Sequence, residues 1–340
     1  MTLQTRVNSV APSLQSALTK RRGATALAVL VSVGLLGLVI SRINVSTALA
    51  RASQIDTRWL VGAAICSAIV LLARGARMSV LVPHAGFAVT LAAVSQQQFL
   101  NRVTPLRLGE LVLPYLLTRH SGEDALRGLV HVVVIRLIDL ALLVIAIIAS
   151  VALREGSSTP TRQAALYGLL FVSIAGLFAL RPLVLAARRV VPALATRLGK
   201  GEHPRVLKLT DSLDRLLAGG LSLSGAQKAK TTLLSLVVLV AQTSLFGAIL
   251  LAFGVSLDPV SLLQGSCVAQ VGAAIPVGSV GTVGTQEASW VAGFSWVGVS
   301  LDDAIVTGIA CQVLTLLFAA VFAGCGALFL SRLPTSAPER

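Results

Sequence analysis

The chain has 340 residues and a net charge of +14, yet 55% of its residues are hydrophobic and only 12% are charged. A mean hydropathy of +0.85 lies far above the range of soluble domains, which predicts an all-α polytopic membrane protein. Aromatic residues make up 4% of the chain, and ten basic residues lie between Arg181 and Lys230. A cytoplasmic loop explains this charge better than nucleic-acid binding does.

Six apolar segments approach or exceed the roughly 20 residues that a transmembrane helix requires. We predict full spans at about residues 24–40, 59–82, 129–153, 164–180, 231–254 and 302–330. We interpret residues 1–23 as a cytoplasmic basic leader and the span after it as an uncleaved first helix, with a cleaved signal peptide as the alternative. Residues 24–330 then form one transmembrane domain, followed by a cytoplasmic tail at residues 331–340.

Two further apolar regions, at about residues 86–118 and 257–299, are interrupted and are not simple spans. Arginines flank the first region, with Arg74 and Arg77 before it and Arg119 and Arg127 after it. Only aspartates flank the second region. If the leader and the loop at residues 181–230 are both cytoplasmic, the first region is re-entrant from the inside and the second from the outside. The predicted fold therefore has about six spans and two opposed re-entrant helical hairpins in an inverted-repeat arrangement, as in many secondary transporters.

The second region contains the stronger break, and its candidate residues are Pro276, Gly278, Gly281, Gly284, Gln286 and Glu287. Proline removes a backbone donor and glycine permits unusual conformations, so a continuous helix is not expected here. Such backbone is tolerated at membrane depth only where protein or a watery cavity satisfies it, which points to a substrate site. If a half-helix begins near Gly284, Glu287 lies in its first turn, where the helix dipole stabilises a carboxylate. That capping role alone is the alternative to a functional one.

The first region has a similar order of amides, Pro, Gly and Glu, and its candidate residues are Gln97, Asn101, Arg102, Pro105, Arg107, Gly109 and Glu110. Guanidinium groups bind phosphate through two parallel hydrogen bonds, so Arg102 and Arg107 suit a lipid headgroup. Anchoring at the membrane surface is the alternative for both arginines. Glu110 is either an intramembrane carboxylate or an interfacial one in water.

Arg136 and Asp139 lie three residues apart in the predicted span 129–153, so they share one helix face and are expected to pair within the membrane. Mutual neutralisation is the alternative to a transport role. Nucleotide-binding, zinc-protease and nucleophile-elbow motifs are all absent, and the four histidines have no metal spacing. We therefore expect no enzyme activity, no metal and no cofactor.

These motifs give the chain a family resemblance over about residues 20–330. The segment from Asn101 to Glu110, the segment from Arg136 to Asp139, and the segment from Pro276 to Glu287 resemble the lysylphosphatidylglycerol synthase transmembrane-region family. This family includes the membrane half of multiple peptide resistance factors and stand-alone relatives linked to glycolipid or hopanoid export. Ile135 stands where many relatives are expected to have an acidic residue. We also expect no aminoacyl-transferase domain, which argues against lysyl transfer.

The resemblance implies a flippase-like protein that moves a phospholipid, aminoacyl-lipid, glycolipid or hopanoid between the leaflets of the inner or plasma membrane. The alternative is a non-transporting accessory subunit of a lipid-modifying or glycosyltransferase system. The expected partners are a membrane lipid as substrate, and a lipid-modifying enzyme or a second copy of the chain. Both termini are expected in the cytoplasm, and no nucleic acid is expected to bind.

Overall fold

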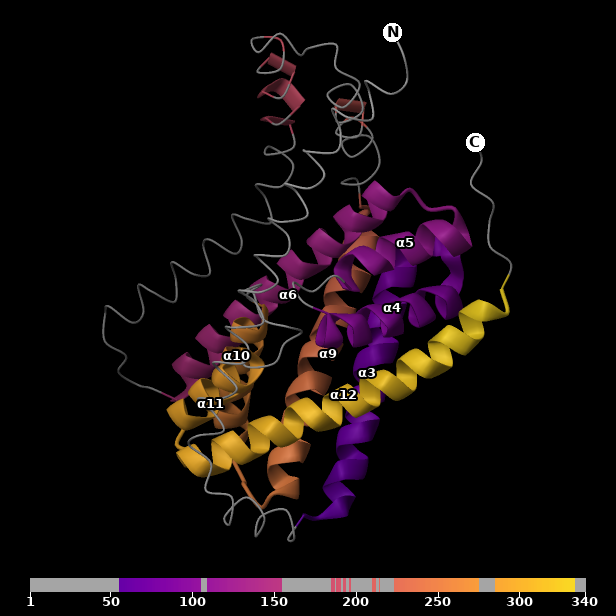
Figure 1. Ribbon diagram of the computed structural model, residues 1–340. Coiled ribbons are helices and arrows are strands. Elements are labelled where there is room, and N and C mark those ends of the chain that lie inside the picture. The colour runs from indigo at the N-terminus through magenta and orange to yellow at the C-terminus, as the bar shows by residue number, and fades with distance from the viewer. Residues whose placement is uncertain are drawn as a thin grey trace, which may run out of the picture.

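The structure is a computed structural model that describes residues 55–104, 109–154, 223–274 and 285–333, together with scattered positions between residues 185 and 214. Within these four ranges every regular element is a helix (Figure 1). The α-helices are α3 (Thr57–Leu81), α4 (Gly86–Val103), α5 (Gly109–Ser121), α6 (Ala125–Arg154), α9 (Gly225–Ala252), α10 (Pro259–Ala274), α11 (Thr285–Trp296) and α12 (Leu301–Ser331). A 3-10 helix, η1 (Pro83–Ala85), joins α3 to α4.

Four helices, α3, α6, α9 and α12, are long and apolar enough to cross a membrane. They correspond to the predicted spans 59–82, 129–153, 231–254 and 302–330. The other predicted spans, 24–40 and 164–180, and the leader at residues 1–23 lie outside the described residues, as do most of the loop 181–230 and of the tail 331–340. The total number of spans therefore stays a prediction.

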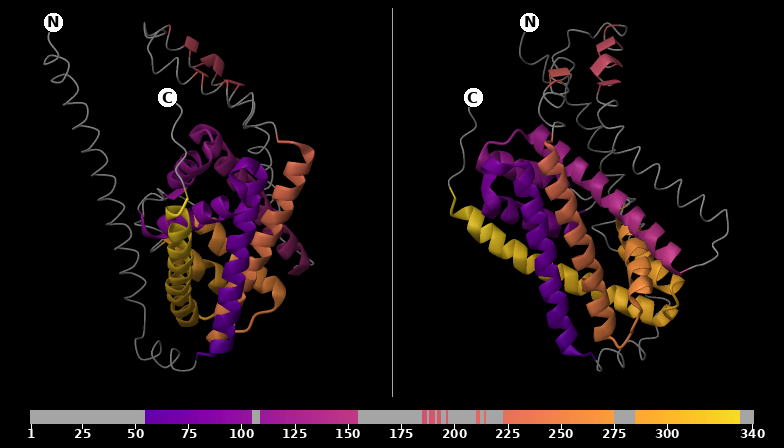
Figure 2. Two further views of the ribbon diagram at one scale, coloured as in Figure 1. Left: turned by 90° about the vertical axis from the view of Figure 1, so that its right-hand side faces the viewer. Right: turned by 180° about the vertical axis from the view of Figure 1, so that it is seen from behind.

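The helices α3 and α9 lie side by side and run in opposite directions (Figure 2). At one end, the backbone N–H of Asp56 donates to the carbonyl of Ala252 over 3.0 Å. At the other end, the side-chain amide of Gln227 donates to the carbonyl of Val80 over 3.2 Å. We call these the Ala252 end and the Val80 end of the helix bundle. Gln227 also completes a capping box with Ser224, which explains why α9 begins at this point.

The shorter helices form two hairpins, α4 packing on α5 and α10 packing on α11. Both connections of the α4–α5 hairpin lie at the Val80 end, where His84 Nε2 in η1 lies 2.6 Å from Glu123 Oε2 in the α5–α6 turn. The α10–α11 hairpin follows the end of α9 and precedes α12, so its connections lie at the Ala252 end. The hairpins thus approach from opposite ends of the bundle, as the predicted regions 86–118 and 257–299 require (Figure 1). Their depth in a membrane, and so their re-entrant character, stays a prediction.

Helix α12 packs against both hairpins at points where it carries glycine. A Cβ added at Gly308 would stand 3.0 Å from the indole Cδ1 of Trp290 in α11. A Cβ added at Gly326 would stand 3.2 Å from the carbonyl oxygen of Ala92 in α4. Larger side chains at these positions would push the hairpins away from α12, so the glycines set how closely the elements approach.

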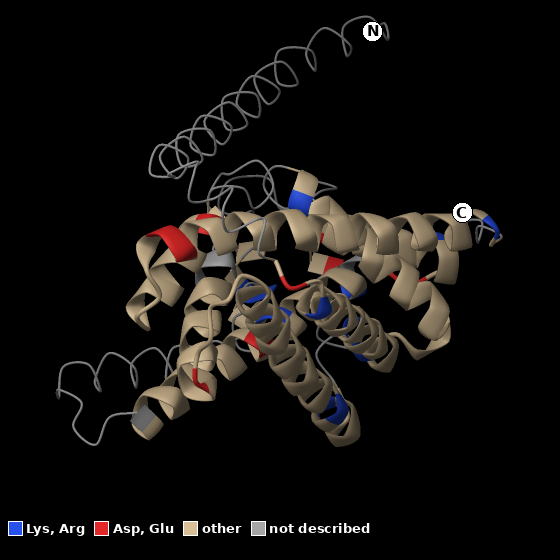
Figure 3. Ribbon diagram, turned by 90° about the horizontal axis from the view of Figure 1, so that it is seen from below, with Lys and Arg blue, Asp and Glu red and all other residues tan. Residues whose placement is uncertain are grey.

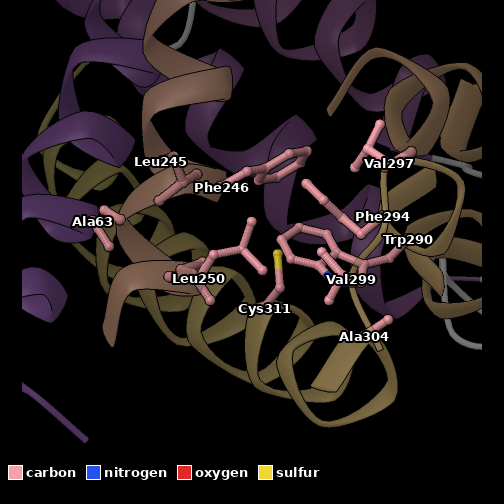
Figure 4. Close-up of a cluster of buried hydrophobic side chains, with 13 residues drawn as sticks. Ala63, Leu245, Phe246, Leu250, Trp290, Phe294, Val297, Val299, Ala304 and Cys311 are labelled. Atoms are coloured by element: carbon pink, nitrogen blue, oxygen red, sulfur yellow. The ribbon is translucent and has the colours of Figure 1, made fainter. Parts of the chain in front are cut away.

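The α10–α11 hairpin rests on a buried aromatic cluster (Figure 4). The ring centroids of Trp290 and Phe246 lie 4.8 Å apart, and those of Trp290 and Phe294 lie 4.5 Å apart. Trp290 Nε1 donates to Thr307 Oγ1 of α12 over 3.1 Å, so the indole is buried without an unsatisfied donor. Trp290 thereby connects α9, α11 and α12 in one packed core.

Helices α10 and α11 approach most closely at Gly265 and Gly293, and this contact is sensitive to a single methyl group. A Cβ at Gly293 would stand 2.5 Å from the carbonyl oxygen of Gly265. We expect Gly293→Ala to lower the free energy of unfolding by about 1–3 kcal/mol, because the backbone of α10 must move to make room. The measurement is thermal unfolding in detergent, read by a thiol-reactive dye that labels Cys267 only when this buried residue becomes exposed.

Gly324→Ala is the matched control, because a Cβ at Gly324 meets no atom within 4 Å. This variant should be at least as stable as the unmodified chain, since alanine favours a helix over glycine. If both variants lost the same stability, the α10–α11 contact would not be the cause of the loss in Gly293→Ala.

Candidate functional site

A cavity of about 230 Å³ lies between the long helices and the hairpins. A water molecule occupies about 30 Å³ in the liquid, so the cavity has room for several waters or a small polar group. Its polar lining comes from α3, α4, α6, α9, α10 and α11. These lining residues are Arg74, Arg77, Gln97, Gln98, Asn101, Arg102, Arg136, Asp139, Ser235, Gln242, Gln270 and Gln286.

The cavity lies near the middle of α6 and α9, two of the helices that are able to cross a membrane, and near the Val80 end of α3. Asp139 is near the midpoint of α6, about 20 Å from either end at 1.5 Å per residue. Ser235 and Gln242 lie on either side of the midpoint of α9. In the view from below, basic segments lie among the helices in the centre of the assembly as well as at its ends (Figure 3). The charged site is therefore inside the bundle.

The inner ends of the two hairpins meet at this cavity. Arg102, in the last turn of α4, donates from Nη1 to Oε1 of Gln286 in the first turn of α11 over 3.5 Å. Glu287 lies beside Gln286, is only 2% exposed and interacts electrostatically with Arg102. A cation at a helix C-terminus and an anion at a helix N-terminus both match the helix dipole. The prediction that Glu287 lies in the first turn of a half-helix is confirmed, because α11 begins at Thr285.

Two interhelical ion pairs line the cavity, and they correct one prediction. Arg77 of α3 pairs with Asp139 of α6 and also donates from Nη1 to Ser235 Oγ of α9 over 2.6 Å. Arg136 of α6 pairs with Glu110 of α5, with 2.8 Å between Nη2 and Oε1. The predicted pair between Arg136 and Asp139 is therefore wrong. Arg136 and Asp139 each have an opposite charge on a neighbouring helix, and these two interhelical pairs replace the predicted pair within α6.

Gly109 has a steric role at the point where α5 begins. A Cβ there would stand 2.5 Å from Asn101 Oδ1 and 2.6 Å from the carbonyl oxygen of Gln97. Glycine thus lets the start of α5 lie directly against the end of α4. This close approach places Glu110, the next residue, within reach of Arg136.

The structure brings most of the predicted site residues together. Gln97, Asn101, Arg102, Arg136, Asp139 and Gln286 line the cavity, and Gly109, Glu110 and Glu287 adjoin it. The other predicted site residues lie outside the described residues, and these are Pro105, Arg107, Pro276, Gly278, Gly281 and Gly284. Among the described residues there is no cluster of three or more His, Cys, Asp or Glu side chains that could hold a metal ion.

Sequence reasoning missed several polar residues that line the cavity. Arg74 and Arg77 were interpreted only as basic flanks, yet both point into the site, and Arg77 is 4% exposed. Their spacing of three residues on an apolar helix was a usable signal, because it places both on one face. Ser235 and Gln242 were missed too, although two polar residues within one predicted span give a similar signal.

The fold and the cavity together define a helical, membrane-embedded protein with an internal, charged site where two hairpins meet. The chain belongs to the family described as "Lysylphosphatidylglycerol synthase TM region", which it matches over residues 25–323. This match confirms the resemblance seen in the sequence. Neither the curated proteins nor the solved structures give a significant match to the chain.

The Arg77–Asp139 pair yields a test of what holds the site together. Asp139→Asn should lower the free energy of unfolding by about 3 kcal/mol, because it leaves the buried Arg77 charge without a counter-charge. Arg77→Met combined with Asp139→Leu should recover much of this loss, since no uncompensated charge remains. Unfolding midpoints in detergent, followed by circular dichroism, measure both effects.

Asp302→Asn is the control, because Asp302 is an exposed carboxylate in the first turn of α12. It should change the midpoint far less than Asp139→Asn does. A double variant that is less stable than Asp139→Asn alone would contradict the importance of charge balance at this position.

Proposed function

We propose that the protein moves a polar-headed lipid between the two leaflets of a membrane. The observation that carries this proposal is the charged cavity where the two hairpins meet, at the middle of the long apolar helices α6 and α9. Membership of a family related to lipid handling supports it. A polar cavity at this depth lowers the main barrier to leaflet exchange, which is the transfer of a headgroup through hydrocarbon.

In this mechanism the headgroup enters the cavity while the acyl tails remain in the bilayer. Arg102 and Arg107 receive phosphate, and the amides of Gln97, Asn101 and Gln286 offer further hydrogen bonds. Glu110 and Glu287 recognise a cationic moiety or take up protons. The mechanism contains no covalent step and requires no cofactor. A lipid-modifying enzyme or a second copy of the chain is a compatible partner.

The charges at the two ends of the bundle support an orientation. Arg119, Arg127, Lys228 and Lys230 belong to the Val80 end, whereas the Ala252 end has Asp258, Asp302 and Asp303 and one arginine, Arg58. By the positive-inside rule the Val80 end is cytoplasmic. The α4–α5 hairpin then enters from the cytoplasm and the α10–α11 hairpin from the outside, as two re-entrant halves of an inverted repeat. Both chain termini are then cytoplasmic, in the inner or plasma membrane.

Leaflet exchange in proteoliposomes tests the transport proposal. Arg102→Ala and Glu287→Gln should each reduce the exchange rate of a lipid labelled on its acyl chain by at least about tenfold, the effect of losing one hydrogen bond to a charged group. Exchange is measured by chemical quenching of the label in the outer leaflet. Elution in size-exclusion chromatography verifies that each variant remains folded.

Arg58→Ala and Asp302→Asn serve as matched controls, because they remove the same kinds of charge at exposed positions. Both should exchange lipid at the unmodified rate. Unchanged exchange in Arg102→Ala and Glu287→Gln would remove these residues from the mechanism. If the unmodified protein does not exceed protein-free vesicles, lipid translocation itself is wrong and a non-transporting accessory role is favoured.

The orientation has its own test, which uses single cysteines in a chain without the four native ones. Cysteines replacing Asp124 and Ala226 should react with a membrane-impermeant thiol reagent only from the cytoplasmic side. Cysteines replacing Ser256 and Leu301 should react only from the outside. All four positions are exposed, and they mark the two ends of the bundle. Labelling of Asp124 and Ala226 from opposite sides would contradict the proposed entry of the α4–α5 hairpin from the cytoplasm.

A further inference from the structure

Arg74 is the cavity arginine that has no ion-pair or hydrogen-bond partner of its own among the described residues. Four guanidinium groups face the site, and three of them have hydrogen-bonding partners: Arg77 with Asp139 and Ser235, Arg102 with Gln286, and Arg136 with Glu110. Among the described residues, no hydrogen bond or ion pair involves the Arg74 side chain. It lies within electrostatic range of the other three arginines, which adds repulsion, and of Asp139, which already forms an ion pair with Arg77.

The charge balance of the described site leaves one positive charge. Asp139 balances Arg77, Glu110 balances Arg136, and Glu287 lies in electrostatic range of Arg102. The carboxylate in electrostatic range of Arg74 is Asp139, which is already paired with Arg77, so four arginines face three carboxylates among the described residues. Burying a charge without a counter-charge is costly, so a site of this kind is completed by an anionic ligand.

The hydrogen-bonding capacity of the lining agrees with the charge. Three buried donor atoms of cavity residues have no hydrogen-bond partner, namely Arg77 Nε, Gln98 Nε2 and Gln270 Nε2. The only comparable acceptor of a cavity residue in the described chain is Asn101 Oδ1, which lies against Gly109. Surplus donors require a ligand that supplies acceptors only, and an anionic phosphate does so.

We infer that the cavity binds the phosphodiester of a lipid headgroup and that Arg74 is a phosphate ligand of this site, in addition to the Arg102 and Arg107 of the proposed function. A phosphodiester carries one negative charge, which equals the single unbalanced charge of the site. A phosphomonoester carries up to two negative charges and would leave the site with an excess of negative charge. The planar Arg74 side chain is able to bind two phosphate oxygens in parallel, and the unpartnered donors of Arg77, Gln98 and Gln270 belong to the same lining. This inference rests on the proposed function for the lipid nature of the ligand.

Binding to the purified protein in detergent tests the inference. The probes are dioctanoyl phosphatidylglycerol and dioctanoylglycerol, which has the same tails and no phosphate. Intrinsic tryptophan fluorescence reports binding, because Trp290 lines the cavity. The phosphate-containing lipid should bind at least about tenfold more tightly, and Arg74→Gln should remove most of this difference. Arg74→Lys should retain part of it, because the charge remains while the two-pronged geometry is lost.

Arg58→Gln is the matched control, since it removes an exposed arginine from the same helix. It should bind both lipids as the unmodified protein does. Arg74→Gln should also raise the unfolding midpoint without ligand, because it removes an uncompensated charge, and added phosphatidylglycerol should then stabilise it less than the unmodified protein. This second readout verifies that the variant is folded.

Two results would overturn the inference: equal binding of both lipids by the unmodified protein, or unchanged phosphatidylglycerol binding by Arg74→Gln. Leaflet exchange separates this outcome from failure of the proposed function. Phosphate-dependent binding through Arg74 without any exchange would retain the site and reject translocation. Exchange that proceeds equally for phosphate-containing and phosphate-free lipids would retain translocation and reject the anion site.

Discussion

One buried guanidinium, that of Arg77, fixes how the long helices converge. It is 4% exposed in a bundle made largely of apolar side chains, so its charge and its donors must be satisfied locally. Asp139 and Ser235 supply these partners from α6 and α9. A contact of this kind is weak evidence for stability, because desolvation offsets much of the attraction. Its effect is to set the mutual register of α3, α6 and α9, and the cavity forms beside it.

The two hairpins also depend on each other through charged side chains, which lie at the ends of α4 and α11. The ends of α4 and α11 expose unpaired backbone groups that an apolar environment does not solvate. The structure places Arg102 at the carbonyl end of α4 and Glu287 at the amide end of α11, close to each other. Each side chain complements its own helix end and also the opposite hairpin. Residues of the candidate site thus also close two helix ends.

Local patterns in the sequence were sufficient to predict the elements but not their partners. The predicted spans 59–82 and 302–330 differ by one or two residues from α3 and α12, because apolar length and caps are local properties. The placement of Glu287 in a first turn was predictable for the same reason. The partners of Arg136 and Asp139 were not, because interhelical register depends on packing that the helical period does not encode. Arg77 lies four residues from the end of α3, and charge counting does not distinguish an arginine that reaches the surface from one that turns inward.

The two glycine contacts of α12 have a mechanical consequence. Gly308 and Gly326 are 18 residues apart, which is five full helical turns, so they lie on one face about 27 Å from each other. One face of α12 therefore contacts α11 near the start of α12 and α4 near the end of α12. A roll of α12 about its own axis displaces both contact points in the same sense. Such a roll would therefore couple the position of the α4–α5 hairpin to that of the α10–α11 hairpin.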